Sequence, residues 1–364
     1  MDDRPCRTRV LSSSQTAPAL EDFYLWDLWP IRRADGSVPQ FDGSEYWMAL
    51  SASRQQAAPA RHDVARIRLL RRAGERWFDC GLVFPDGASP GSREWAGSAV
   101  LDSSGQRVTV RYTAAGDRDH PGPSFAQRLF ESSSAFIPGG AVAFPDWSEH
   151  REMVVQGGPY RSTVAQTTGE AGYIKAFRDP CVFIDPKDRR EHLLFTASLA
   201  ASQTDFDAAV GHATRDSAAG DWEVHEPLLS ADGVNNEMER PHLVHHAGRY
   251  YLFFSTQVRT FHPDVSGPTG LYGFVAESMD GQWRPLNGTG LVLCNPVEEP
   301  YQCYSWLVLN DLQVVSFVDM FGLGGRDPDD PDAFEAGWAP FGGTPAPIDR
   351  IALDSDRAWV MSDA

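Results

Sequence analysis

Three short segments of the 364-residue chain place acidic residues beside tryptophan, arginine and proline. They are Trp26-Asp27-Leu28-Trp29-Pro30, Phe177-Arg178-Asp179-Pro180 and Asn235-Asn236-Glu237-Met238-Glu239-Arg240-Pro241. Each proline disfavours the α conformation of the residue before it, so we expect the segments to be extended or turn-like. Side chains two apart in a strand face the same way, which would pair Glu237 with Glu239.

Carboxylates in such surroundings are suited to glycoside cleavage. That reaction needs two carboxyl groups in different protonation states, one that attacks or activates water and one that donates a proton. Aromatic rings fit the apolar faces of a sugar, and arginine binds hydroxyls and orients carboxylates. Each motif alone is weak, because Asp-Pro turns and Glu-Arg surface pairs are common. The three together predict a carbohydrate site.

The elements that must position these residues read as short strands separated by turns. Asp-Gly breaks occur at Asp35, Asp86, Asp232 and Asp280. Evenly spaced short strands indicate an all-β sandwich, barrel or propeller, and the lack of a 3.6-residue apolar period predicts few and short helices. Strand-like runs cover residues 45–53, 64–72, 107–116, 192–200, 249–258, 270–278, 312–320 and 349–355.

No blade-length repeat is evident in the sequence, and no linker divides the chain after its N-terminal segment. Residues 1–18 are polar and rich in Ser, which predicts a flexible tail before one domain over residues 19–364. The Pro- and Asp-rich residues 326–332 are predicted to form a surface loop.

The composition excludes several classes of partner and site. A net charge of −18 argues against nucleic acid and against an anionic membrane as partners, since both bind positively charged protein surfaces. The five cysteines are scattered without a CxxC pair, so neither a zinc ribbon nor a disulfide framework is expected, and most should be small buried hydrophobes. The N-terminus has no apolar signal region, which predicts a cytoplasmic protein or export by a route independent of a signal peptide.

Nine segments, in order through nearly the whole chain, carry a resemblance to a known family. They are WDLWP, REWAGSAVLD, FRDP, NEMERPHLV, RYYLFFS, GPTGLYGFVAESMDGQWRPLNGTGLVL, PYQCYSW, VVSFVD and FGGTPAPI. Through these segments the sequence resembles glycoside hydrolase family 68, which comprises the levansucrases, inulosucrases and related β-fructofuranosidases. Its arrangement is more similar to the Gram-negative branch than to the Gram-positive one.

This resemblance implies an all-β, single-domain, five-bladed β-propeller with a central, funnel-shaped active site. It implies that Asp27 is the nucleophile, Asp179 the stabiliser of the transition state and Glu239 the general acid/base. It also implies a set of substrate-binding residues, with two tryptophans at the fructosyl pocket and the others on the glucosyl and acceptor side: Trp26, Trp95, Arg178, Glu237, Arg240, Gln257 and Tyr304.

Two departures from the family pattern affect the site. Ala96 replaces a serine whose hydroxyl helps to hold the nucleophile, so we expect one hydrogen bond to Asp27 to be missing. We expect Ser98 to lie too far along the chain to replace it. On the acceptor side, Gln257 stands where relatives carry His or Arg, with Arg259 nearby, which argues against synthesis of long levan.

We expect no metal ion and no cofactor. Asn236 occupies the position of an aspartate that supports a calcium ion in Gram-positive members. His242, His245 and His246 lie in a predicted hairpin, where adjacent residues point to opposite faces, so a shared zinc ion is not expected.

The resemblance and the chemistry together imply a retaining enzyme acting on sucrose. Asp27 would form a covalent fructosyl-enzyme with release of glucose, and Glu239 would then activate water, sucrose or a fructan as acceptor. Because the chain is short for the family, we expect hydrolysis and short fructooligosaccharides to prevail over polymer. Two alternatives stay open: a catalytically inactive sugar-binding propeller, and a β-fructosidase for a fructoside other than sucrose.

Overall fold

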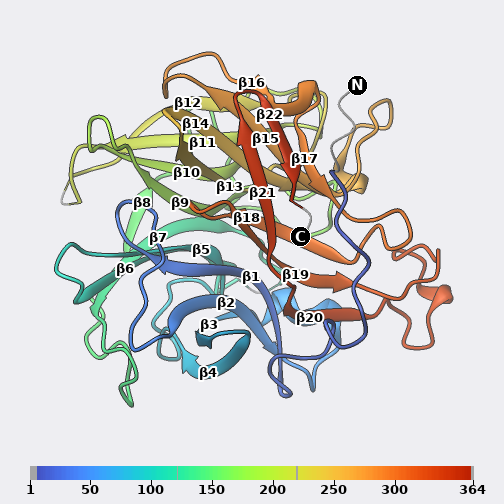
Figure 1. Cartoon of the computed structure of the whole chain (residues 1–364), viewed down its shortest axis with the longest axis horizontal. Coiled ribbons are helices and arrows are strands. Elements are labelled where there is room, and N and C mark those ends of the chain that lie inside the picture. The colour runs from blue at the N-terminus through green and yellow to red at the C-terminus, as the bar shows by residue number, and fades with distance from the viewer. Residues whose placement is uncertain (1–5, 121, 219, 362–364) are drawn as a thin grey trace.

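The computed structural model describes residues 6–120, 122–218 and 220–361, and its strands form five blades around one axis (Figure 1). Blades one and two form a single eight-stranded sheet, because β1 and β5 pair in parallel at Ile31–Ala99 and Arg32–Val100. The innermost strands β1, β5, β9, β13 and β18 follow one another around the axis, and β18 contacts β1 to close the ring. The predicted all-β, five-bladed propeller is confirmed.

The strands of blades one to three have the following bounds: β1 Phe23–Arg32, β2 Glu45–Ser53, β3 Arg66–Ala73, β4 Arg76–Leu82; β5 Arg93–Leu101, β6 Arg107–Ala115, β7 Gln127–Ala135, β8 Arg151–Val154; β9 Phe177–Ile184, β10 Glu191–Ser198, β11 Ala208–Arg215, β12 Glu223–Ser230. Those of blades four and five are β13 Glu239–His246, β14 Arg249–Thr256, β15 Gly270–Ala276, β16 Arg284–Pro285, β17 Leu291–Cys294; β18 Cys303–Val308, β19 Gln313–Met320, β20 Phe341–Pro345, β21 Asp349–Asp354, β22 Arg357–Val360.

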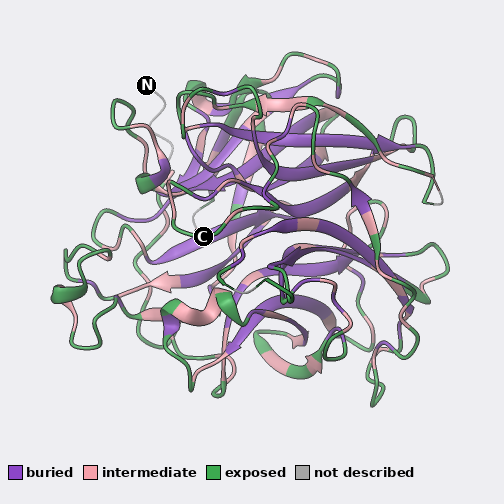
Figure 2. Ribbon diagram, turned by 180° about the vertical axis from the view of Figure 1, so that it is seen from behind, coloured by how far each residue is buried: buried purple, intermediate pink, exposed green. Residues whose placement is uncertain are grey.

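The core lies between the blades. Strand β11 is buried along its whole length and β10 along all but its first residue, because each middle strand is covered on both faces by neighbouring blades. The outermost strands β4 and β12 are largely exposed or half-buried. Buried strands therefore fill the interior and exposed loops surround them (Figure 2). Apolar side chains between blades hold the funnel walls in place.

The local predictions from sequence agree with these elements. All eight strand-like runs coincide with strands, namely β2, β3, β6, β10, β14, β15, β19 and β21. Gly36, Gly87 and Gly233 of the Asp-Gly breaks adopt positive φ, which glycine does at little cost. The described residues contain only four short 3₁₀ helices: η1 Ala58–Asp63, η2 Val258–Thr260, η3 Leu286–Gly288 and η4 Pro331–Ala333. None of their helices has the length and apolar composition needed to cross a membrane.

The N-terminal segment contacts blades four and five over part of its length. Cys294 donates from its backbone N–H to the Cys6 carbonyl at 2.8 Å, and the Leu11 N–H donates to Gln302 Oε1 at 3.1 Å. Residues 1–5 of the predicted tail lie outside the described residues, and the flexibility of residues 1–18 stays a prediction. The five cysteines are free thiols, of which Cys181, Cys294 and Cys303 are buried.

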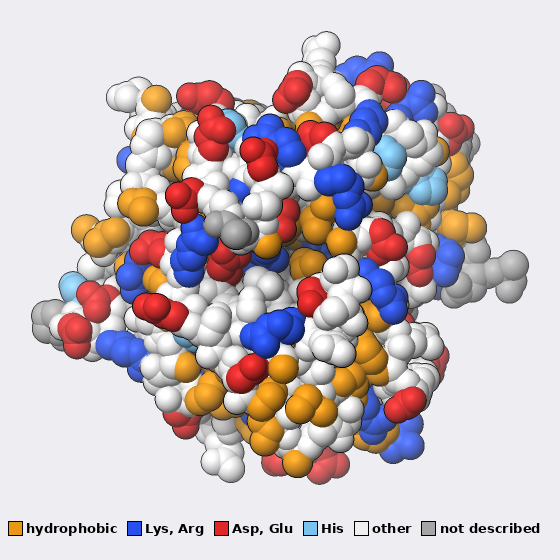
Figure 3. Space-filling view, turned by 90° about the vertical axis from the view of Figure 1, so that its left-hand side faces the viewer, with side chains coloured by type: hydrophobic (Ala, Val, Ile, Leu, Met, Phe, Trp, Pro, Cys, Tyr) orange, Lys and Arg blue, Asp and Glu red, His pale blue; other side chains and the backbone are white. Residues whose placement is uncertain are grey.

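Charged side chains are interspersed on the face of the propeller seen in Figure 3. Red Asp and Glu side chains alternate with blue Lys and Arg side chains there, and neither sign gathers into one large patch. Several of the ion pairs formed are exposed, such as Arg190–Asp216 at 2.9 Å. Such pairs contribute little to stability, so the fold depends on packing between blades.

Candidate active site

Each innermost strand contains one irregularity of the same kind, and these irregularities build the site. At this point two residues of the inner strand stand opposite one residue of its neighbour, or one residue is inserted. The first residues of these bulges are Asp27 in β1, Ala96 in β5, Asp179 in β9, Arg240 in β13 and Ser305 in β18. All but Ala96 have positive φ, between 48° and 60°.

A left-handed backbone at a residue other than glycine costs about 1–3 kcal/mol and concentrates at functional sites. Here it recurs at one level of the propeller, where four blades turn a polar side chain out of the pleated sheet. The four side chains thereby line one cavity of about 1240 Å³ near the axis, and this cavity is the funnel of the propeller. This cavity contains all ten predicted site residues in its lining: Trp26, Asp27, Trp95, Arg178, Asp179, Glu237, Glu239, Arg240, Gln257 and Tyr304.

Arg178 joins the two glutamates that the sequence pairs. Its Nη2 donates to Glu237 Oε1 and to Glu239 Oε1, each at 2.9 Å, so both carboxylates face the funnel as predicted. The Tyr304 hydroxyl donates to the other oxygen of Glu239. Burial and the charge of Glu239 raise the pKa of Glu237 to about 7, against the opposing effect of Arg178. Glu239 is thus held by two donors while it remains partly open to the cavity.

Asp179 is fixed by backbone and side-chain hydrogen bonds, and Arg178 Nε forms a longer ion pair with its Oδ2 at 3.8 Å. Its Oδ2 accepts from Thr196 Oγ1 at 3.0 Å and from the Arg240 N–H at 3.3 Å. Burial raises the pKa of Asp179 to about 7, although the Arg178 charge acts in the opposite direction and Glu239 adds to the rise. The carboxyl group is therefore rigid and weakly acidic, as suits a group that contacts sugar hydroxyls.

Asp27 is half-buried, and its hydrogen bond comes from Ser305 of blade five, whereas Ala96 belongs to blade two on the other side of β1. Burial raises the pKa of Asp27, while the Arg240 charge and a hydrogen bond from the Ser305 hydroxyl lower it. Ser98, which we expected to lie too far away to help, donates instead to the Pro180 carbonyl at 2.9 Å. Ser305 is the hydroxyl that holds the nucleophile candidate, and the sequence alone did not identify it.

Arg240 lies in the cavity lining, and its guanidinium makes three hydrogen bonds to the protein. Its Nη1 donates to Ser305 O at 3.1 Å and Ser305 Oγ at 2.9 Å, and its Nη2 donates to the Leu28 carbonyl at 2.7 Å. The guanidinium is thus directed at the backbone beside Asp27. These contacts join β13 to the backbones of β1 and β18.

Besides Ser305, the cavity lining includes Arg61, His62 and Asp319, which the sequence did not mark as site residues. His62 and Arg61 come from η1, and Asp319 comes from the end of β19. The His62 ring lies edge-on to Trp26 at 5.5 Å, and burial holds its pKa well below the ordinary value, so it is neutral. Burial raises the pKa of Asp319 to about 6 despite Arg61. No signal marked Arg61 and His62, because a short 3₁₀ segment between strands has no periodicity.

His242, His245 and His246 lie in the β13–β14 hairpin, as predicted. His242 is buried, with Nδ1 at 2.9 Å from the Arg240 carbonyl and Nε2 accepting from the Val308 N–H at 2.8 Å. His245 and His246 are half-buried at the end of β13. Both ring nitrogens of His242 are therefore committed to the protein.

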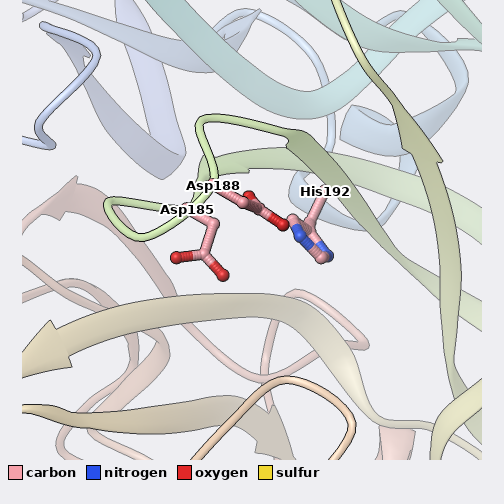
Figure 4. A group of neighbouring side chains, drawn as sticks. All are labelled: Asp185, Asp188 and His192. Atoms are coloured by element: carbon pink, nitrogen blue, oxygen red, sulfur yellow. The ribbon is translucent and has the colours of Figure 1, made fainter.

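One group of possible metal ligands occurs among the described residues, on and after the β9–β10 turn (Figure 4). Asp185, Asp188 and His192 bring one ligand atom each within 4.8 Å of the others. Asp185 accepts from the Tyr250 hydroxyl through both oxygens, at 2.8 and 3.0 Å, and His192 Nδ1 contacts His212 Nε2 at 3.0 Å. None of the three lines the funnel.

Proteins similar to this chain include levansucrases and an inulosucrase. A family model described as Levansucrase/Invertase matches residues 7–213 and 204–362. Levansucrase LscA of Pseudomonas savastanoi pv. glycinea is 31% identical over 99% of this chain and 91% of its own length. The levansucrase of Zymomonas mobilis subsp. mobilis is 32% identical over 94% of this chain and 84% of its own. The inulosucrase of Halalkalicoccus jeotgali, solved bound to kestose, superposes with a TM-score of 0.86 at 37% identity, covering 99% and 92% of the two chains.

Proposed function

The chain belongs to glycoside hydrolase family 68, the levansucrase and invertase family, and on that premise we propose how its residues divide the reaction. The protein cleaves sucrose and transfers the fructosyl unit. Asp27 is the nucleophile, Glu239 the general acid/base and Asp179 the stabiliser of the transition state. The observation that carries this assignment is the meeting of the three carboxyl groups on one funnel floor, each held by named donors.

In the first step Asp27 attacks the anomeric carbon of the fructosyl unit. Glu239 donates a proton to the departing glucosyl oxygen, so glucose leaves and a covalent fructosyl-enzyme remains. The Arg240 guanidinium and the Ser305 hydroxyl stabilise the ionised form of Asp27 needed for attack. Trp26 and Trp95 form the apolar walls of the fructosyl pocket, and the Trp95 ring is fixed by its Nε1 bond to the His62 carbonyl at 3.1 Å.

In the second step Glu239 removes a proton from the acceptor, which attacks the same carbon and frees Asp27. Arg178 and Tyr304 orient Glu239 in both steps, because their hydrogen bonds go to its two different oxygens. Together with Glu237 and Gln257 they form the glucosyl and acceptor side of the funnel. Water as acceptor gives hydrolysis, and sucrose or a short fructooligosaccharide gives transfer. We propose that hydrolysis and short products prevail, since Gln257 replaces the cation of relatives.

The test is incubation of the purified protein with sucrose, with free glucose and free fructose measured separately. We expect glucose release, a shortfall of fructose that reports transfer, and loss of both products in Asp27→Asn. The variant must keep the melting temperature of the natural protein within a few degrees. No glucose release from sucrose by the folded natural protein would overturn the proposal. Turnover of another fructoside would then indicate a different β-fructosidase, and sucrose binding without turnover an inactive sugar-binding propeller.

A further inference from the structure

We propose that the connection between β19 and β20, residues 321–340, forms an outer acceptor subsite at the funnel mouth. In it, Trp338 is the platform for a second sugar unit and Arg259, held by Asp329, is the hydrogen-bond donor. The ligand class is the distal sugar of a fructooligosaccharide or sucrose acceptor. The inference rests on the proposed function and adds to it where a growing product is held.

The connection is an ordered structure rather than a loose loop. It projects from the propeller at the right of Figure 1, in orange-red, and contains η4. The Arg326 guanidinium donates to the carbonyls of Gly322, Leu323 and Ala333 and lies over the Phe334 ring at 4.8 Å. Leu323 is buried. A loop of this length inside a compact domain is usually functional, and its internal bonding gives it one shape.

A chain of polar contacts links this connection to the general acid/base. Arg259 Nη1 pairs with Asp329 Oδ1 at 2.6 Å, and Arg259 Nε donates to Gln257 Oε1 at 2.8 Å. Gln257 in turn forms a side-chain hydrogen bond with Tyr304, whose hydroxyl donates to Glu239. The Asp329 carboxylate therefore fixes the cation that stands next to Gln257. Among the residues that the structure describes, none accepts a hydrogen bond from Arg259 Nη2, so this nitrogen can donate to a sugar hydroxyl.

Trp338 supplies the apolar part of the subsite. Its side chain is 38% exposed and lines the same cavity as Asp27 and Glu239, together with Pro328 and Asp329. An exposed indole beside a sugar-binding cavity is suited to stacking on the apolar face of a pyranose or furanose ring. Water gains nothing from this contact, whereas a sugar acceptor does. The subsite therefore favours transfer over hydrolysis in proportion to the acceptor contacts it makes.

The experiment measures the partition between transfer and hydrolysis with sucrose as the only substrate. Glucose release gives total turnover, free fructose gives hydrolysis, and the difference gives transfer. In Trp338→Ala and in Asp329→Asn we expect the transfer-to-hydrolysis ratio to fall about five- to tenfold, the loss of one aromatic or charge-assisted contact. Trp338→Tyr, which keeps a ring, should fall less than Trp338→Ala. Asp332→Asn is the matched control on the same connection, and its ratio should stay within twofold of the natural one.

The outcomes separate this inference from the function on which it rests. If the natural protein releases glucose and both Trp338→Ala and Asp329→Asn keep the natural ratio, the outer subsite is wrong and the proposed function stands. If Asp332→Asn lowers the ratio as much as Asp329→Asn does, the effect belongs to the loop charge and the Arg259 pairing is wrong. No glucose release by the natural protein refutes the proposed function instead.

Discussion

Replacing Ser305 with alanine tests whether one hydroxyl holds the nucleophile in this chain. The inner strand β1, which carries Asp27, has β5 and β18 as its neighbours around the axis. The bulge of β5 contains Ala96 and that of β18 contains Ser305, so only Ser305 offers a hydroxyl to Asp27. A hydrogen bond to a charged group contributes about 1.5–3 kcal/mol. At about 1.4 kcal/mol for each factor of ten in rate, Ser305→Ala should lower kcat/KM for glucose release roughly 10- to 150-fold.

The pH dependence of the variant gives a second, independent readout. The Ser305 hydrogen bond lowers the pKa of Asp27, so its removal raises that pKa further above the ordinary value. Because the nucleophile must be ionised, the acidic limb of the kcat/KM profile should move to higher pH. Ala96→Ser in the Ser305→Ala background restores a hydroxyl on the other side of Asp27. It should recover at least part of the rate and return the acidic limb towards its natural position.

Ser132→Ala is the control for removing a buried hydroxyl far from the funnel. Ser132 is buried in β7 and donates to the Ser148 carbonyl at 2.8 Å, so its loss should lower stability without changing the pH profile. Arg240 keeps its bond to the Ser305 carbonyl in the Ser305→Ala variant, which limits structural damage. The reasoning is refuted if Ser305→Ala retains the natural kcat/KM and the natural acidic limb.

Three further changes test the rest of the site. Tyr304→Phe removes the hydroxyl that donates to Glu239. Such a bond contributes about 1.5–3 kcal/mol, so glucose-release assays should show a kcat roughly 10- to 150-fold lower, and a natural rate would count against the role of Tyr304. Arg178→Lys keeps the positive charge, but an ammonium group does not reproduce the planar guanidinium that donates to Glu237 and Glu239. We expect kcat/KM to fall at least about 100-fold. A variant that keeps half of the natural activity would contradict the bridging role of Arg178. Asp179→Asn should abolish turnover yet melt at a higher temperature than the natural protein at pH 8. The pKa of Asp179 in the folded protein, about 7, lies above the ordinary 3.8, so the natural protein loses folding stability as pH rises between these two values, by at most roughly 4 kcal/mol. The advantage of the Asn variant should therefore vanish below pH 4. Equal melting temperatures of the two proteins at pH 8 would refute this prediction.

The sequence was informative wherever side-chain type alone decides the local structure. Apolar runs such as residues 45–53 and 249–258 became strands because β-branched and aromatic residues fit a pleated, two-sided core. Glu237 and Glu239 were predicted to share a face, and one guanidinium nitrogen indeed contacts both. The number of blades, in contrast, was predicted only from the resemblance to the family, because the spacing of strand-like runs does not give a blade number.

What the sequence could not predict was set by contacts between distant blades. The Arg240 guanidinium contacts the Leu28 carbonyl, 212 residues away in the chain, and no local sequence pattern predicts this contact. His62 was passed over in a short 3₁₀ segment, although it packs edge-on against Trp26. The contacts of Arg240 and His62 depend on the register in which the five blades meet around the axis. A single sequence without a visible repeat does not give that register.

The bulges explain why the repeat is invisible in the sequence and plain in the backbone. All five inner strands carry the irregularity at one level, so the backbone obeys one rule while the side chains there are Asp, Ala, Asp, Arg and Ser. Four of the five bulges place a side chain in the cavity lining, and these four side chains make different contacts. Because the residue types at the bulges differ, the shared backbone feature leaves no recurring pattern in the sequence. Ala96 is the one bulge residue without a polar side chain, so Ala96→Ser adds a hydroxyl on the side of Asp27 where the natural protein has none, and it should lower the pKa of Asp27.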